Sequence, residues 1–88
     1  MAEEQKKIDA KEAVALAKKY LHELKGISTS ESFLEEIEMS KDNQCWSVTL
    51  SYPATDYSGL ILVPRKAYKI FEVDVNTGQM VSMKIRQV

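Results

Sequence analysis

The side chains best suited to chemistry in this sequence are one histidine, one cysteine and a group of carboxylates. Zinc sites need several histidine or cysteine ligands, which this chain cannot supply. His22 falls on the side of a predicted helix away from its apolar stripe, which is typical of a solvated histidine. Cys45 follows turn residues and has no adjacent basic residue, so we interpret it as a structural thiol rather than a nucleophile. We therefore predict no metal and no cofactor.

The carboxylates form two groups. Glu35, Glu36 and Glu38 lie close together, while Asp74 and Asn76 flank a predicted turn. Carboxylates can share a proton or hold calcium, but this spacing lacks the alternating oxygen ligands and the glycine of a calcium loop. Solvated charges on a strand face are the simpler interpretation, so we predict that the protein is not an enzyme. A hydrolase or isomerase built on the three glutamates is the enzymatic alternative.

Length and composition limit the function further. A chain of 88 residues is expected to form one domain with a thin core, since it buries only about 60–65% of its unfolded surface. The hydrophobic share of 44% and the charged share of 28% are ordinary for a globular protein. A net charge of −1 gives no electrostatic basis for binding nucleic acid or acidic lipid.

The cellular compartment is predicted from three features that the sequence lacks, namely a cysteine pair, a signal peptide and a membrane span. One cysteine cannot form an intrachain disulfide, which favours a reducing compartment. Residues 1–7 are charged, are expected to be disordered, and are followed by no apolar run of signal-peptide length. No segment approaches the ~20 apolar residues that span a bilayer. We predict a single cytoplasmic domain over residues 1–88, without a membrane partner.

An amphipathic helix is predicted over residues 9–25. Asp9 and Glu12 have the spacing of a capping box, and Gly26 is suited to a left-handed stop. Apolar residues at helical spacing form one stripe that comprises Ala13, Val14, Ala17, Tyr20, Leu21 and Leu24.

A β-hairpin is predicted most plainly over residues 68–88. Apolar and polar residues alternate with period two on both sides of an Asn-Thr-Gly sequence. Gly78 can take the positive φ that a three-residue hairpin loop requires at its last position. This register places Val73 opposite Val81 and Phe71 opposite Met83.

Two more strands are predicted between the helix and this hairpin. Residues 46–52 alternate cleanly, and Pro53 is expected to end that strand because proline cannot donate to the ladder. Residues 33–39 alternate less well, with one face formed by Phe33, Glu35, Ile37 and Met39. Residues 60–63 either extend the third strand, with a break at Pro64, or form a loop over the sheet edge. The adjacent apolar pair at 70–71 predicts a bulge.

These elements predict an α+β fold. The helix has one apolar stripe and the sheet of about four antiparallel strands has one apolar face. Packing the N-terminal helix across that face buries both surfaces.

The run FEVDVNTGQMVSMKI, preceded by Tyr68 and by the N-terminal helix, resembles the PepSY domain. Strands of that family read as an aromatic residue, alternating acids and aliphatics, a Thr-Gly turn, and aliphatics with a serine. The resemblance covers the last two strands well and the helix loosely. It implies a helix laid on an antiparallel sheet, similar to half of a cystatin-like fold.

The same resemblance implies a non-enzymatic role. PepSY domains occur in propeptides of secreted metallopeptidases and in membrane or cell-wall proteins, where an inhibitory or chaperone-like contact has been proposed. This chain departs from that setting, since it shows neither an export signal nor a peptidase.

Residues 57–66 are the best candidates for contact with a protein partner. Aromatic and aliphatic residues beside arginine are typical of interfaces. The contact residues that we expect are Tyr57, Leu60, Leu62, Arg65 and Lys66. The alternative is that Leu60 and Leu62 cover the end of the core. An unpaired sheet edge is a second candidate, through which a homodimer is possible.

The leading hypothesis is therefore a non-enzymatic protein-binding module with a regulatory or inhibitory role, whose partner the sequence does not identify. The alternative is a carrier that holds a small apolar ligand between helix and sheet. A carrier requires a cavity of about 300 Å³ or more.

Overall fold

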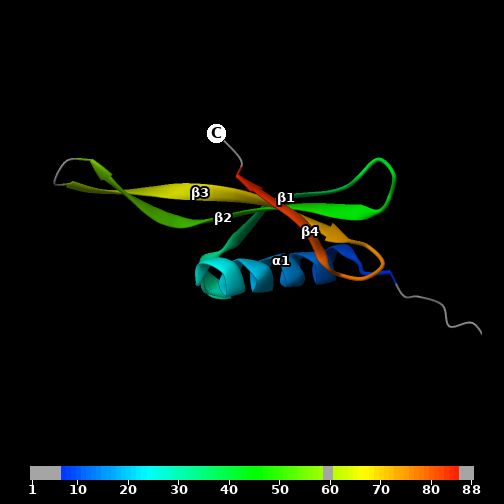
Figure 1. Cartoon of the computed structure of the whole chain (residues 1–88). Helices are drawn as coiled ribbons and strands as arrows, with labels where there is room; N and C mark the ends of the chain where they lie inside the picture. The colour runs from blue at the N-terminus through cyan, green and yellow to red at the C-terminus, as the bar shows by residue number, and fades with distance from the viewer. Residues whose placement is uncertain (1–6, 59–60, 86–88) are drawn as a thin grey trace, which may run out of the picture.

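The computed structural model describes residues 7–58 and 61–85. Its elements are α1 (Ala10–Lys25), the 3-10 turn η1 (Thr29–Glu31), β1 (Phe33–Met39), β2 (Cys45–Ser58), β3 (Ile61–Asp74) and β4 (Met80–Ile85). The strands pair antiparallel in the order β1-β2-β3-β4, and α1 covers one face of the sheet (Figure 1). The predicted α+β architecture is confirmed. The predicted disorder of residues 1–7 concerns a segment that, except for Lys7, lies outside the described residues.

The helix begins and ends where its capping residues predict. The Glu12 N–H donates to Asp9 Oδ1 at 2.9 Å. At the other end, Gly26 has a φ of 71° and its N–H donates to the His22 carbonyl at 2.8 Å. Ala13, Ala17 and Leu21 are fully buried, so the apolar stripe faces the sheet. Leu24 was also expected in this stripe but is 53% exposed in the last turn.

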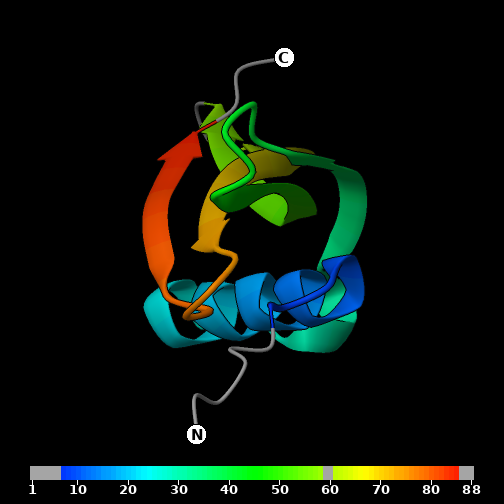
Figure 2. The same cartoon turned by 90° about the vertical axis from the view of Figure 1, so that its right-hand side faces the viewer.

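The core lies between α1 and the sheet. Register places three rows of residues across the helix-facing side, which are Met39–Trp46–Val73–Met80, Ile37–Val48–Phe71–Met83 and Leu34–Leu50–Lys69–Ile85. Val48, Leu50, Phe71 and Val73 are fully buried, which confirms the predicted faces of β2 and β3. The other side of the sheet, here called the open face, is not covered by a helix (Figure 2).

Hydrogen bonds tie the start of the helix to the sheet. The Ile8 N–H donates to the Val75 carbonyl at 2.9 Å, and Trp46 Nε1 donates to the Ile8 carbonyl at 3.0 Å. Farther along, the Tyr20 hydroxyl donates to the Gly78 carbonyl at 2.9 Å. These three bonds fix how α1 lies across β2 and β3.

A bulge in β1 changes which residues face the helix. The register shifts between Leu34 and Glu36, so Glu35 is an extra residue. Leu34 therefore shares the helix-facing side with Ile37, whereas Phe33 lies on the open face. The predicted grouping of Phe33 with Ile37 is wrong, because an inserted residue reverses the period-two pattern.

The turn between β3 and β4 is longer than predicted. The Asp74 N–H donates to the Gln79 carbonyl at 2.8 Å, and the Gly78 N–H donates to the Asp74 carbonyl at 2.9 Å. Asp74 Oδ1 also accepts from the N–H groups of Asn76 and Thr77, at 2.7 and 2.9 Å. The turn thus contains residues 75–78, held by the Asp74 carboxylate. Gly78 has the predicted positive φ, at 76°.

The longer turn alters the hairpin register at its start. Val73 pairs with Met80 rather than with Val81 as predicted, because the register shifts by one residue just before Val73. Val81 is 58% exposed. Beyond this bulge Phe71 pairs with Met83, as predicted.

The predicted bulge at residues 70–71 is absent from the described β2–β3 ladder, which is regular there. Ile70 pairs with Thr49 on the open face, and Phe71 pairs with Val48 on the helix-facing side. Two adjacent apolar residues therefore reflect partial burial of both faces of the sheet.

Pro53 does not end its strand, contrary to the prediction. β2 continues to Ser58 and pairs with β3 over its whole length, and Pro64 lies inside β3 in the same way. Residues 61–63 extend the third strand, which was one of the two interpretations, but the expected break at Pro64 is absent, because β3 pairs with β2 through that residue. Leu60 lies outside the described residues.

Hydrogen bonding explains how both prolines fit. The Val75 N–H donates to the Gln44 carbonyl at 2.8 Å, next to the last pair of the β2–β3 ladder. Hydrogen-bonded and non-hydrogen-bonded pairs alternate in antiparallel ladders. Gln44 and Val75 form a hydrogen-bonded pair, and counting from it puts Pro53 and Pro64 in non-hydrogen-bonded pairs. The nitrogen of each proline therefore points away from the partner strand. Their missing N–H groups therefore remove no bond from this ladder.

Replacing Phe71 with Ala is expected to destabilise the domain by about 3–5 kcal/mol, because it leaves a cavity at the centre of the core. Total stability of such a domain is on the order of 5–10 kcal/mol. Urea unfolding followed by circular dichroism measures the change. A variant with an unchanged midpoint would place Phe71 outside the core.

Candidate functional site

The most distinctive surface is the part of the β2–β3 hairpin that extends beyond the other strands. The last β1 pair is Phe33 with Ser51, and the last β4 pair is Ile85 with Lys69. Residues 52–58 and 61–67, here called the arm, continue as two strands only (Figure 1). At about 3.3 Å per residue the arm is about 20 Å long. An isolated two-stranded ribbon is marginally stable in water, so this one gains from a contact.

A pocket lies where the arm leaves the sheet. It has a volume of about 330 Å³. This pocket is here called the arm pocket, and its lining comprises Phe33, Ser51, Tyr52, Pro53, Pro64, Arg65 and Lys66. Phe33 is 57% exposed, so an aromatic ring stands at the surface beside two proline rings. The pocket therefore combines rigid apolar surface with two cationic side chains.

A buried hydroxyl and a carboxylate hold the edge of this pocket. The Ser51 hydroxyl donates to Glu35 Oε2 at 2.6 Å, and Lys66 Nζ lies 3.8 Å from the same oxygen. The extra residue of the β1 bulge thus supplies the carboxylate. An exposed pair of this kind contributes little to stability, so its main effect is to position Lys66.

The structure brings most of the predicted contact residues into the arm. Arg65 and Lys66 line the arm pocket, and Leu62, which is 58% exposed, lies farther out. Register pairs Tyr57 with Leu62. Leu60 lies outside the described residues. The alternative that Leu62 covers the end of the core is wrong, because the side chain is exposed on the arm.

Sequence reasoning missed Phe33, Pro53 and Pro64 as members of this site. Pro53 had been interpreted as the end of a strand, and Phe33 had been placed on the wrong face of β1. The available signal was the pair of prolines within two apolar, aromatic-containing stretches on either side of Gly59. Such prolines are tolerated at strand edges.

The residues considered for catalysis are dispersed. His22 is exposed, with Nδ1 3.3 Å from the Ile27 carbonyl. Burial raises the pKa of the Cys45 thiol, and the nearby carboxylates of Glu72 and Asp74 raise the pKa further. A raised pKa lowers the thiolate fraction at neutral pH.

The acidic cluster is spread along β1, and its members have different partners. Glu35 bonds to Ser51, while Glu36 and Glu38 pair with Thr49 and Ser47 along β1. Within residues 7–58 and 61–85, no three histidine, cysteine or acidic side chains are grouped as a metal site requires.

A second carboxylate on the open face has the same pair of partners as Glu35. The Ser82 hydroxyl donates to Glu72 Oε1 at 2.6 Å, and Lys84 Nζ lies 3.9 Å from that oxygen. Each arrangement links a carboxylate to side chains on other strands of the sheet. We interpret both as cross-strand contacts that support the polar face of the sheet.

Lys69 is the unexpected polar residue of the helix-facing side. It lies between Leu50 and Ile85 in its row and is only 8% exposed. Burial lowers the pKa of its ammonium group, and the positive charge of Lys25 lowers the pKa further. The long apolar stem covers the end of the core, as lysine stems commonly do.

Replacing Lys69 with Met is expected to raise the melting temperature near neutral pH. The folded-state pKa lies below the ordinary value, so folding disfavours the charged lysine at every pH where it is protonated. The gain should shrink as the pH rises toward about 10.4, where unfolded lysine loses its proton. Thermal unfolding of parent and variant at neutral and alkaline pH measures both effects. Lys19→Met, at an exposed helix position, is the control and should change little.

No helix within the described residues is long and apolar enough to span a membrane. Comparison with protein-family models, curated proteins and solved structures finds no match to the chain.

Proposed function

We propose that this chain is a non-enzymatic protein-binding module, PepSY-like in type, that docks a partner on its arm. The observation that carries the proposal is the arm itself. Beyond its base, where Tyr52 belongs to the core cluster, the arm places exposed apolar and cationic residues on a two-stranded ribbon. A cytoplasmic setting and a regulatory or inhibitory effect on the partner are parts of the same hypothesis.

The exposed groups of the arm favour a protein partner. Leu62 is 58% exposed and Phe33 is 57% exposed, at the outer part and at the base of the arm. Apolar side chains of this size recover hydrophobic free energy only when another surface covers them. Arginine and aromatic residues are also enriched at the centres of protein interfaces.

The arm pocket indicates the chemistry of the partner. Its volume of about 330 Å³ accommodates one large apolar side chain between Phe33 and the two prolines. Arg65 and Lys66 at its border favour a neighbouring carboxylate. We therefore expect the partner to insert an aliphatic or aromatic anchor next to an acidic residue.

The prolines indicate how the partner approaches. Pro53 and Pro64 direct their nitrogens toward the two outer edges of the arm, so neither edge offers an uninterrupted row of donors. Addition of a strand to the arm is thereby disfavoured. The partner is expected to pack against a face of the arm.

The carrier hypothesis has weaker support. Between α1 and the sheet, Leu21, Val48 and Phe71 are fully buried against one another in one core cluster. A groove of about 420 Å³ exists at the side, between α1 and β1, but it is open to solvent. An apolar ligand there would keep much of its surface in water.

Replacing Leu62 with Ser, or Lys66 with Glu, both on the open face of the arm by register, is expected to release the partner. The first change removes an exposed apolar contact and the second opposes an acidic residue. Affinity capture from extracts of the source cells, quantified by mass spectrometry, identifies proteins bound by the parent. Both substitutions should reduce capture of the same protein at least about tenfold, a loss of ~1.4 kcal/mol.

Val81→Ser is the matched control for Leu62→Ser. Val81 is also 58% exposed but lies on β4, away from the arm. If all captured proteins bind the parent, Leu62→Ser and Lys66→Glu equally well, the arm is not the docking surface. Equal losses with Val81→Ser would indicate nonspecific apolar adhesion instead.

The hypothesis of a homodimer through an edge strand is tested separately. The prolines disfavour pairing of two arms, so a second copy would have to pair at β1 or β4. Both strands are bulged, and β1 carries three glutamates, which would face like charges in a self-paired β1. Sedimentation equilibrium is therefore expected to show a monomer, and a dimer at micromolar concentration would support the edge-strand hypothesis.

A further inference from the structure

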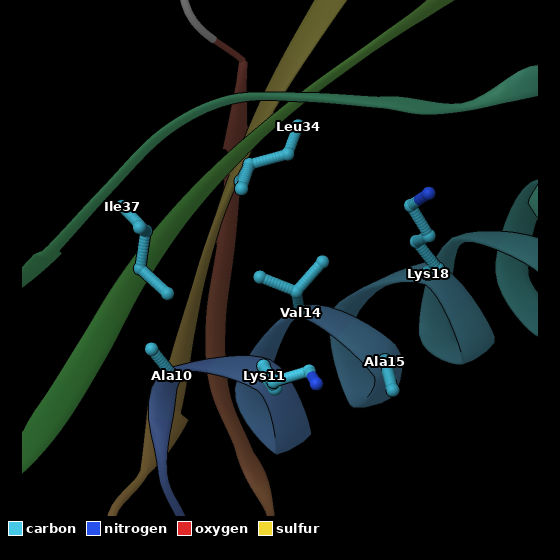
Figure 3. A pocket seen from close by; sticks show the side chains of 7 residues that line it. All are labelled: Ala10, Lys11, Val14, Ala15, Lys18, Leu34 and Ile37. Atoms are coloured by element: carbon cyan, nitrogen blue, oxygen red, sulfur yellow. The ribbon is translucent and has the colours of Figure 1, made fainter.

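The groove between α1 and β1 adjoins an unpaired strand edge. Its lining comprises Ala10, Lys11, Val14, Ala15, Lys18, Leu34 and Ile37 (Figure 3). Leu34 and Ile37 of β1 point toward Val14 of α1 across the groove. Leu34 remains 44% exposed although it lies on the helix-facing side. The groove is therefore largely apolar, has a volume of about 420 Å³ and lies along one side of the sheet.

Within the part of the chain that the structure describes, the backbone of β1 has N–H and C=O groups without a partner strand along this groove. Among the described residues β1 pairs only with β2, so its other side is open. The Ser40 N–H donates to the Cys45 carbonyl at 2.9 Å, at the end of the β1–β2 ladder. Since bonded and non-bonded pairs alternate, the backbone N–H and C=O groups of Ile37 and Met39 point outward. They can pair with one further strand.

Charges on the two sides of the edge specify the sequence of such a strand. On the open face, β1 presents the carboxylates of Glu36 and Glu38, two residues apart. On the groove side, Lys11 and Lys18 lie on the helix wall, about 10 Å apart along its axis. A strand with basic residues toward the glutamates and apolar residues in the groove satisfies both sides.

We infer that β1 and the adjoining groove bind an extended peptide segment of another protein, in which apolar residues alternate with basic ones. Main-chain bonds to β1 supply affinity, and the groove selects the apolar side chains, as in other cases of strand addition. A one-residue slip would place basic residues beside Lys11 and Lys18 and apolar residues beside glutamates. This site is separate from the arm.

A second copy of this chain fits the edge less well. Its β4 also alternates apolar and basic residues around Lys84, but Lys84 already lies 3.9 Å from Glu72. Pairing of β4 with β1 of the next molecule would also be a head-to-tail contact, which gives a ring or an open filament, whereas most soluble oligomers are two-fold dimers with the same patch on both subunits. The segment of another protein is therefore the occupant to which the site is assigned.

The test uses the full chain labelled with ¹⁵N and a capped eight-residue synthetic peptide that alternates Lys with Leu. A second peptide replaces each Lys with Glu, and a third has the residues of the first with all the leucines adjacent. Titration followed by NMR should shift amide signals of β1 and of the groove side of α1. The alternating Lys peptide should bind at least tenfold more tightly than either control peptide.

Variants of the full chain locate the site. Ala15→Arg adds a long cationic side chain at the border of the groove, at an exposed helix position where arginine suits the helix, and should weaken binding of the Lys peptide at least tenfold. Glu38→Lys should reverse the preference from the Lys peptide to the Glu peptide. Glu23→Lys makes the same change in charge on α1 outside the groove lining and should leave the preference unchanged. Dispersed amide signals verify that each variant is folded.

Several results would overturn the inference. They are equal affinity for all three peptides, signal changes confined to the arm or β4, and a Glu38→Lys variant that behaves like Glu23→Lys. Concentration-dependent self-association that is abolished by Ala15→Arg would assign the groove to a second copy instead.

Discussion

A mismatch in length between the helix and the central strands governs this molecule. At 1.5 Å per residue the 16 residues of α1 span about 24 Å, whereas 14-residue strands at about 3.3 Å per residue span about 46 Å. One helix therefore buries only part of the β2–β3 hairpin. α1 covers the apolar rows of β2 and β3, and the remainder of the hairpin extends beyond the helix. The arm is the direct consequence.

Each edge of the sheet carries a feature that limits pairing. The arm has a proline on each outer edge, β1 has a bulge and three glutamates, and β4 has a bulge beside Val81. Natural sheets commonly use bulges, charges and prolines to prevent indiscriminate pairing of edges. Here the prolines disfavour strand addition to the arm, so the proposed contact is with a face of the arm. The charged edge at β1 still permits pairing, but only with a strand of complementary charge.

The bulge at Glu35 links the two proposed sites. It turns Leu34 toward the groove and Phe33 toward the arm pocket, and it brings the Glu35 carboxylate to Ser51 and Lys66. The single inserted residue of β1 therefore shapes both the groove and the arm pocket.

The sequence alone determined the helix, the order of four strands, and the faces of β2 and of the Phe71–Val73 stretch, because capping residues and period-two alternation act locally. It also indicated Leu62, Arg65 and Lys66 as contact residues. It did not reveal the two bulges, the four-residue turn or the passage of the strands through Pro53 and Pro64. Those features depend on which backbone groups face a partner strand, and only the assembled ladder decides that. The burial of Lys69 and the two surface sites likewise arise from where one short helix ends against a longer sheet.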